Sequence, residues 1–197
     1  MKINFPLLAL AVGAFAIGTT EFSPMGFSPE IANDLSVSIP QAGLLISAYA
    51  VGVMIGAPLM TLWLARFPKK TALILLMAIF TIGNVLATVA PDYMSLLGAR
   101  LITSLNHGAF FGLGSVVAAS VVPKDKQASA VAMMFMGLTI ANIGGVPLAT
   151  WLSQNTSWRI AFAAISILGI MTILALWKAL PQDHDVVKPN VAKELRV

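Results

Sequence analysis

Apolar and polar positions alternate along this chain in long blocks. Six charge-free apolar stretches follow one another at residues 3–20, 35–65, 71–91, 101–123, 127–158 and 160–177. A membrane-spanning helix needs about 20 mostly apolar residues, and each stretch meets or approaches that length. Transmembrane β-strands are shorter and alternate in polarity. The pattern therefore predicts an all-α membrane protein with six transmembrane helices.

Two stretches must be extended before every span is long enough to cross a membrane. The first span has to continue past Glu21, and the fourth has to begin near Tyr93, which places Arg100 inside it. We expect the spans at residues 6–30, 41–64, 71–90, 93–122, 128–152 and 159–180. Together they form one transmembrane domain over residues 1–180. The polar residues 181–197, which include two prolines, are predicted to be a cytoplasmic tail.

The composition agrees with a membrane protein and narrows the chemistry. Charged residues make up 10% of the chain, against about 25% in soluble domains. The net charge is +4, but the basic residues stand in short clusters between apolar runs, so no nucleic-acid partner is expected. With no cysteine, two histidines and no carboxylate cluster, neither a disulfide nor a metal site is predicted. The sequence has no phosphate loop or nucleophile elbow, so we expect no enzyme activity, no cofactor and no use of ATP.

The loops differ in charge from one side of the membrane to the other. The side that carries both ends of the chain has Lys2, Arg66, Lys69, Lys70, Lys124, Lys126, Lys178, Lys188, Lys193 and Arg196. The other side has Arg159 as its basic residue, beside Glu30, Asp34 and Asp92. By the positive-inside rule, both termini are expected in the cytoplasm. An even number of spans requires the same result.

Spans two and five share a short sequence echo. Residues 56–64 read GAPLMTLWL and residues 145–152 read GVPLATWL, late in each span. If the chain consists of two three-helix repeats, these spans occupy corresponding places, and the odd number of helices inverts the second repeat. We therefore expect two inverted three-helix repeats. Chance similarity between two apolar helices that contain Gly and Pro is the alternative.

Glu21, Arg100 and His107 are charged or titratable side chains that lie well inside the predicted spans. Charged groups there usually face a bundle interior or a wet cavity, so Glu21 is a candidate for proton or substrate binding. Arg100 and His107 lie seven residues apart on one helical face, with Thr103 between them. At a rise of about 1.5 Å per residue, Glu21 and Arg100 both lie about 10 Å below the outer surface and could form an ion pair. Each has a plainer interpretation: a solvated Glu21, a snorkelling Arg100 and a structural His107.

Asparagine side chains also fall within three predicted spans, at Asn84, Asn106 and Asn142. The common role of an amide there is a hydrogen bond between helices, which is what we expect of Asn84. Asn106 and Asn142 could instead face a cavity, so they join the candidate residues for proton or substrate binding.

Several longer segments resemble one known family. They are GTTEFSPMGFSPEIA at residues 18–32, SIPQAGLLISAYAVGVMIGAPL at 38–59, LNHGAFFG at 105–112, MGLTIANIGGVPLATWL at 136–152 and SWRIAF at 157–162. Together they make the chain similar to the N-terminal half of a bacterial major-facilitator permease of the drug:proton antiporter group, which contains arabinose-efflux-permease-like proteins. The resemblance implies half of a major-facilitator fold in the bacterial inner membrane. It also implies secondary active, proton-coupled efflux of a drug, sugar or metabolite.

The resemblance implies roles for particular residues. Arg100 matches the membrane-embedded arginine of span four that is linked in the family to proton coupling. Glu21 matches an acidic position of span one that is linked to substrate or proton handling. Gly145 and Pro147 match the span-five antiporter motif, which is split here by Val146.

The loop between spans two and three departs from the family pattern. Arg66, Lys69 and Lys70 match the basic end of its motif, G-x-x-x-D-R-x-G-R-R/K. The glycine, the aspartate and the second glycine are replaced by Thr61, Ala65 and Pro68. The missing aspartate removes one partner of the family's charge-relay latch on the cytoplasmic face.

Six spans are predicted for this chain, whereas members of the family have twelve, arranged as two six-helix halves around a central cavity. A transporter of this length would need a second half, either a second copy of the chain or a separate C-terminal half. Its other partners would be the lipid bilayer, a small-molecule substrate and protons. Two further interpretations stand beside this one: a truncated or split transporter fragment without independent activity, and a non-transport membrane interaction protein.

Overall fold

The computed structural model describes residues 4–181, and this part of the chain has six helical segments long and apolar enough to cross a membrane. Four spans are single helices: α1 (Phe5–Gly26), α3 (Ile39–Leu64), α4 (Lys69–Thr88) and α9 (Trp158–Ala179). Two spans are interrupted: α5 (Tyr93–Ser104) leads into α6 (His107–Ser120), and α7 (Gln127–Ile140) leads through the π-helical η2 (Ala141–Gly145) into α8 (Val146–Asn155). The short α2 (Ser28–Asp34) and the 3-10 turn η1 (Lys124–Lys126) lie in connections. The predicted all-α fold with six spans is confirmed.

Local sequence sets where two of the spans begin. The Ser38 hydroxyl accepts the backbone N–H of Gln41, whose side chain accepts the backbone N–H of Ser38 in return. Asp92 and Ser95 form the same reciprocal pair at the start of α5. Such capping boxes satisfy backbone N–H groups that a helix start leaves unpaired. Each box therefore fixes the point at which a short connection re-enters the bundle.

The first span ends at Gly26, whereas the sequence pattern carried it to residue 30. Phe27 leaves the helical conformation with φ −121° and ψ 22°. Pro29 lies in the first turn of the separate helix α2. Proline favours a first turn because its missing N–H would be unpaired there anyway, so it starts a new helix instead of extending α1. The predicted tail, residues 181–197, lies outside the described residues except for Pro181.

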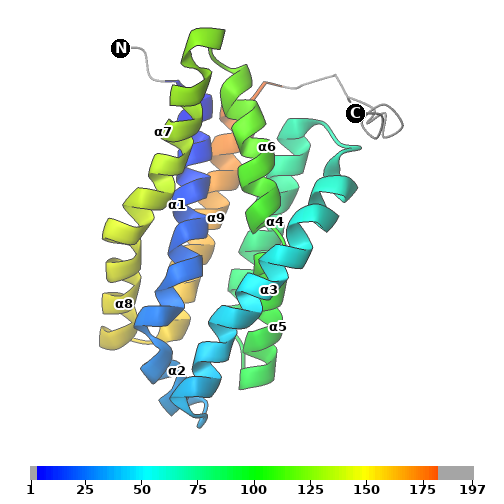
Figure 1. Cartoon of the computed structure of the whole chain (residues 1–197). Coiled ribbons are helices and arrows are strands. Elements are labelled where there is room, and N and C mark those ends of the chain that lie inside the picture. Colours follow the sequence, from blue (N-terminus) through cyan, green and yellow to red (C-terminus); the bar gives the residue numbers. More distant parts are fainter. Residues whose placement is uncertain (1–3, 182–197) are drawn as a thin grey trace.

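The two ends of the bundle carry opposite charges. The start of α1 and the end of α9 lie at the same end, which is uppermost in Figure 1. This basic end also holds the start of α4 and the turn η1, and with them Lys69, Lys124 and Lys126. The opposite, acidic end holds α2 and the start of α5, with Asp34 and Asp92. Between the ends, α4 and α9 pack against each other and lie behind α1, α6 and α3 in Figure 1.

Packing partners repeat between the two halves of the chain. The helix α1 packs mainly on α7 and α9, and the broken span α5–α6 packs mainly on α3 and α4. Exchanging the first three spans with the last three converts one set of contacts into the other. Gly56 of α3 lies against Leu105, between α5 and α6. Gly145 lies against Phe15 and Thr19 of α1. The glycine that the two echo sequences share therefore packs on span four in the first repeat and on span one in the second, as inverted repeats require.

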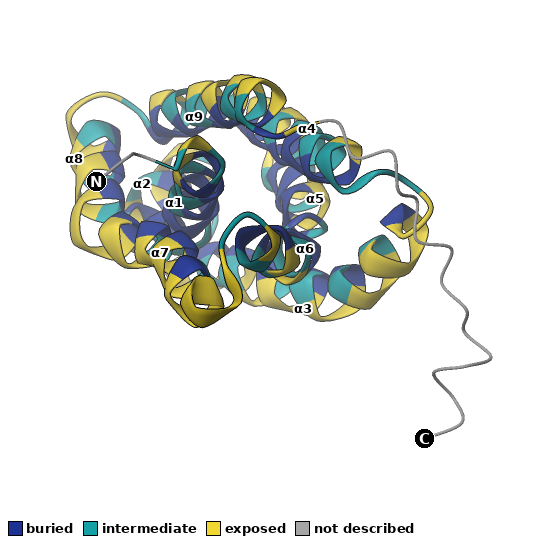
Figure 2. Ribbon diagram, turned by 90° about the horizontal axis from the view of Figure 1, so that it is seen from above, coloured by how far each residue is buried: buried dark blue, intermediate teal, exposed yellow. Residues whose placement is uncertain are grey.

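Buried side chains fill the contacts between helices, whereas α3 and the α7–α8 span have wide exposed faces (Figure 2). The core includes Leu10, Ile17, Phe80, Phe110 and Phe162. Exposed apolar side chains on the two spans include Met54, Ile55, Leu59, Leu62, Met136, Ile140, Ile143, Leu148 and Trp151. Apolar faces this wide are rare on soluble monomers and meet lipid or another protein.

Candidate functional site

Glu21 and His107 meet halfway along the bundle. Glu21 lies on α1 with a side chain that is 27% exposed, and its Oε2 atom is 3.8 Å from Nδ1 of His107. His107 is the first residue of α6, directly after the break in the fourth span, and its side chain is 15% exposed. The contact becomes an ion pair when the imidazole is protonated. It therefore joins α1 to α6 through two groups that can exchange protons.

Tyr49 of α3 holds the other side of the same imidazole. Its hydroxyl lies 3.2 Å from Nδ1 of His107, and the two rings meet edge to face with centroids 6.0 Å apart. The tyrosine is 2% exposed, so its hydroxyl needs a partner within the protein. Phe111 packs on the His107 ring from the next turn of α6, with centroids 5.1 Å apart. Sequence reasoning did not single out Tyr49, although it is the one tyrosine in the middle of a predicted span.

Arg100 is buried beside this group and does not snorkel to the interface. Its residue is 1% exposed, and its Nη1 atom donates to the backbone carbonyl of Thr20 over 2.8 Å. The guanidinium carbon lies 4.2 Å from the centre of the Tyr49 ring, within cation–π range. Within residues 4–181, Glu21 lies against His107 and Asp34 pairs with Arg159, so the considered Glu21–Arg100 pair is not formed. Arg100 instead binds the carbonyl of the residue that precedes Glu21.

A buried hydrogen-bond chain supports this position of Arg100. The Thr20 hydroxyl, 3.4 Å from the arginine Nη1, donates to Oδ1 of Asn84 over 2.7 Å. The Asn84 amide in turn donates to the carbonyl of Phe80, one turn earlier in α4. The predicted helix–helix hydrogen bond of Asn84 is confirmed, and it ties α1 to α4.

Thr103 and Asn106 lie inside the bundle and not on its exposed face. The Thr103 hydroxyl donates to the carbonyl of Ala99, and its side chain packs against Gly83 of α4. Asn106 is fully buried, and its place beside a cavity stays a prediction. Within the described part of the chain, its amide nitrogen and oxygen have no hydrogen-bond partner, and neither do Nε and Nη2 of Arg100. The interior near the break of the fourth span therefore contains unpaired polar groups.

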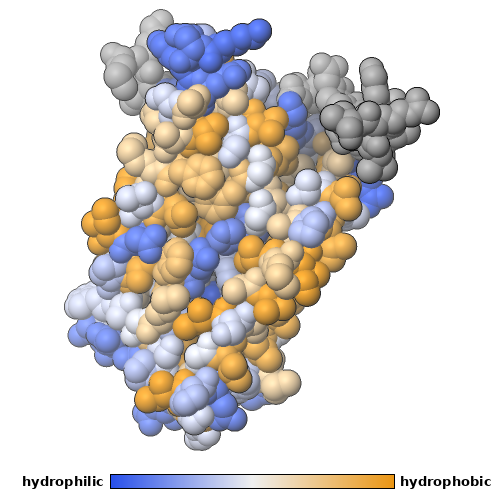
Figure 3. Space-filling model, viewed as in Figure 1, coloured by the Kyte–Doolittle hydropathy of each residue, from blue (hydrophilic) through white to orange (hydrophobic). Residues whose placement is uncertain are grey.

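Asn142, Gly145 and Pro147 lie at the interruption of the fifth span. Asn142 is exposed on the π-helical segment, and its amide donates to the carbonyl of Leu138 over 3.0 Å. Gly145 packs against α1, and Pro147 is exposed in the first turn of α8. Single π-helical turns inside α-helices are frequent at functional sites. Figure 3 shows hydrophilic residues gathered halfway along the face that α7–α8 and α3 flank, with apolar residues around them.

The basic residues of the second loop lie apart from this group, at the basic end. Arg66 is exposed and stacks on Trp63, with its guanidinium carbon 5.4 Å from the ring centre. Lys70 donates from Nζ to the carbonyl of Leu180 over 2.6 Å, which links the start of α4 to the end of α9. Lys69 and Lys70 line a cavity of about 230 Å³ there. Among residues 4–181 none of these cations forms an ion pair, in keeping with alanine at the family's aspartate position.

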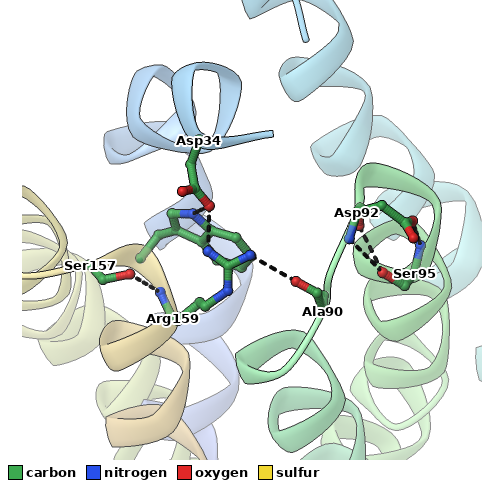
Figure 4. Close-up of polar contacts among 7 residues, drawn as sticks. Asp34, Ala90, Asp92, Ser95, Ser157 and Arg159 are labelled. Atoms are coloured by element: carbon green, nitrogen blue, oxygen red, sulfur yellow. Dashed lines mark hydrogen bonds and ion pairs between the residues drawn. The ribbon is translucent and has the colours of Figure 1, made fainter. Parts of the chain in front are cut away.

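A polar clamp closes the acidic end (Figure 4). Arg159 at the start of α9 pairs with Asp34 of α2 and donates to the carbonyl of Ala90 over 2.9 Å. Trp158 donates from Nε1 to the same Asp34 oxygen over 3.0 Å. The hydrogen bond from Arg159 is the main reason that the pKa of Asp34 lies below its ordinary value. Sequence reasoning placed these residues on one side of the membrane but did not pair them.

Comparison with known proteins identifies the architecture. A profile of the Major Facilitator Superfamily matches residues 10–196. The chain is 66% identical over 197 residues to the inner membrane transport protein YdhP of Escherichia coli K12, which covers 100% of the chain and 51% of that protein. It is 33% identical over 192 residues to a chloramphenicol resistance protein of Streptomyces lividans, covering 98% of the chain and 49% of that protein.

Solved structures agree on the fold. The xylose transporter XylE of Escherichia coli, partially occluded and inward open, superimposes with a TM-score of 0.74 and 18% identity over 90% of the chain and 48% of that protein. The chain thus spans about half the length of the relatives that it matches. The profile match and the six-span fold together show that the chain belongs to the Major Facilitator Superfamily of membrane transporters.

Proposed function

We propose that the chain is one six-helix half of a proton-coupled transporter that expels a small molecule from a bacterial cell. The observation that carries the proposal is the contact between Glu21 and His107, which is partly exposed in the middle of an otherwise apolar face. Glu21 is the one carboxylate within the membrane-spanning part of the described helices. Charged groups at such positions are costly and usually mark proton or substrate pathways. Relatives named for efflux and resistance support the direction.

The geometry gives each group a distinct role in a proton-coupled cycle. Glu21 is reachable from the exposed face, so it is the group that takes up and releases the proton. His107 pairs with the ionised carboxylate only when the imidazole is itself protonated. Arg100 is buried and bound to the Thr20 carbonyl, so its positive charge stays in place beside the site. Substrate and proton can then compete for the exposed pair, which is the requirement for antiport.

The charge difference between the ends supports an orientation in the bacterial inner membrane. We propose that the basic end, with both termini, faces the cytoplasm, because cytoplasmic loops carry an excess of Lys and Arg. The acidic end with its clamp then faces outward. The basic tail residues that contribute to this argument lie outside the described residues.

A second six-helix half would complete the site. Glu21 and His107 are partly exposed, and Asn142 is exposed. No helix within residues 4–181 covers the face on which they lie. The wide apolar faces of α3 and α7–α8 flank this region and would meet lipid or the second half. A separate C-terminal half or a second copy of the chain could occupy it. The two alternatives are a fragment without independent activity and a non-transport membrane protein. A transport assay distinguishes both from a transporter half.

The test is proton-driven flux in vesicles. The chain would be fused to the C-terminal half of YdhP and reconstituted, with radiolabelled chloramphenicol and xylose as probes. We expect a pH gradient to drive accumulation of at least one probe, with loss of this accumulation in Glu21→Gln. Asp125→Asn, which makes the same chemical change in an exposed turn, should behave as wild type. Flux without dependence on the gradient or on Glu21 would contradict the proposal. If the fusion moves neither probe while the parent YdhP moves one, this chain is not a transporter half.

A further inference from the structure

The buried hydroxyl of Tyr49 has one hydrogen-bond partner, and this limits the state of the imidazole that it contacts. The hydroxyl lies 3.2 Å from Nδ1 of His107, and no other partner of this hydroxyl is present in residues 4–181. A buried O–H group left without an acceptor costs about 1–3 kcal/mol. If neutral His107 carried its proton on Nδ1, two donors would face each other or the tyrosine proton would be left unpaired. The tyrosine must therefore donate to a bare Nδ1.

Arg100 favours the same assignment. Its guanidinium lies over the Tyr49 ring, 4.2 Å from the ring centre. A positive charge next to a phenol stabilises electron density on the phenol oxygen as its proton moves toward an acceptor. The cation over the ring face thus strengthens the Tyr49 hydroxyl as a hydrogen-bond donor. Among residues 4–181, Arg100 forms no hydrogen bond with the imidazole, so it acts on His107 through Tyr49.

The second ring nitrogen of His107 is open. Nε2 has no hydrogen-bond partner within the described residues, and it is not among their buried unpaired polar atoms. The imidazole side chain is 15% exposed, and among residues 4–181 Glu21 is the one charged group within ion-pair distance of it, on the Nδ1 side. A proton fixed on Nε2 would therefore point to the exposed part of the site. Such an N–H binds an acceptor atom such as a carbonyl, hydroxyl or nitro oxygen.

We propose that Tyr49 is a positioning residue that fixes neutral His107 with its proton on Nε2, so that His107 donates a hydrogen bond to an acceptor group of the transported molecule. The assignment of the His107 tautomer stands on geometry alone. The hydrogen bond from His107 to a transported molecule rests on the proposed transport function. The hydrogen bond to one nitrogen decides which nitrogen of a histidine carries the proton. Without the tyrosine hydroxyl, the Glu21 carboxylate is the nearest acceptor, and the proton should move to Nδ1.

Nitrogen NMR tests the tautomer assignment directly. The sequence has two histidines, so His184→Gln leaves His107 as the single histidine signal of the full chain. The protein is purified without a histidine tag and held in lipid nanodiscs. With ¹⁵N-labelled histidine, we expect the Nε2-protonated tautomer at neutral to basic pH. Tyr49→Phe keeps the ring beneath Arg100 but removes the hydroxyl, and should shift the population to the Nδ1-protonated tautomer. Tyr93→Phe, which removes the hydroxyl that donates to the Gln41 carbonyl, should leave the tautomer unchanged.

The outcomes separate this inference from the proposed function. An Nδ1-protonated wild type, or a tautomer that Tyr49→Phe leaves unchanged, overturns the role of Tyr49 whether or not the protein transports anything. In the vesicle assay, Tyr49→Phe should raise KM several-fold with kcat little changed, because a donor to the substrate is misplaced. The expected tautomers without any proton-driven flux would refute the transport proposal and leave the positioning role intact. A loss of kcat at unchanged KM would overturn the donor role.

Discussion

Removal of Arg159 should destabilise the acidic end by an amount that the clamp geometry fixes. Arg159→Ala deletes three interactions at once: the pair with Asp34, the hydrogen bond to the Ala90 carbonyl and the stacking on Trp158, 4.1 Å from the ring centre. These interactions tie the start of α9 to α2 and to the end of α4. Without them, three chain segments lose their common link.

The magnitude follows from exposure. The Asp34 side chain is 46% exposed, so its pair with Arg159 contributes about 0.2–1 kcal/mol after solvent screening. A charge-assisted hydrogen bond contributes about 1.5–3 kcal/mol. Cation–π stacking at an exposed site adds about 0.5–1 kcal/mol. Because the three share one side chain and do not add fully, we expect a total loss of about 2–3 kcal/mol. Asp34→Asn keeps an acceptor for Trp158 and should cost less than about 1 kcal/mol.

The assay is equilibrium unfolding of the full chain in mixed micelles, followed by tryptophan fluorescence. The comparison uses wild type, Arg159→Ala, Asp34→Asn and Arg159→Lys. Lysine keeps the charge but not the planar fork that reaches two acceptors, so its loss should fall between the other two. If Asp34→Asn destabilises as much as Arg159→Ala, the exposed pair dominates the clamp and the magnitudes above are wrong. A loss below about 0.5 kcal/mol in Arg159→Ala would also contradict them.

Three further predictions concern stability. Asp34 has a folded pKa below its ordinary value of 3.8, so its contribution is complete above that pH and is lost as the pH falls through the folded pKa. The stability difference between wild type and Asp34→Asn should therefore shrink below pH 3.8, as measured by unfolding titrations at several pH values. Gly137→Ala places a methyl group against the Ala11 carbonyl of α1 and should cost about 1–3 kcal/mol, whereas Gly144→Ala meets no neighbour and should not destabilise in the same assay. Asn84→Leu leaves the buried Thr20 hydroxyl without its acceptor and should lower the free energy of unfolding by about 1–3 kcal/mol.

The fold was predictable because span length and polarity dominate in a membrane. Long apolar blocks and the charges between them predicted six spans, and the Gly-x-Pro-Leu echo predicted the repeat. The break at Leu105 and Asn106 was not predictable, because no proline marks it. It lies where Gly56 brings α3 close to the backbone of Leu105, which is a consequence of packing between spans.

The residues of the candidate site stood out in the sequence, but their contacts were not predictable. Glu21, Arg100 and His107 stood out because charged groups are rare within spans. Their partners depend on how each helix is rotated about its axis, which spacing along one helix does not reveal. Tyr49 was missed because a tyrosine in an apolar helix resembles an ordinary core residue. The pairing of Arg159 with Asp34 had a usable signal, since Arg159 is the one basic residue that the charge pattern assigns to the acidic side.

Proton release on substrate binding shows whether Glu21 carries the proton coupled to transport. The fusion with the C-terminal half of YdhP would be held in weakly buffered nanodiscs with a pH-sensitive dye, and chloramphenicol or xylose added as the probe that the vesicle assay selects. We expect stoichiometric release of protons by wild type and by Asp125→Asn, and none by Glu21→Gln at matched probe binding. Equal release by Glu21→Gln, or probe binding without any release by wild type, would contradict that role of Glu21.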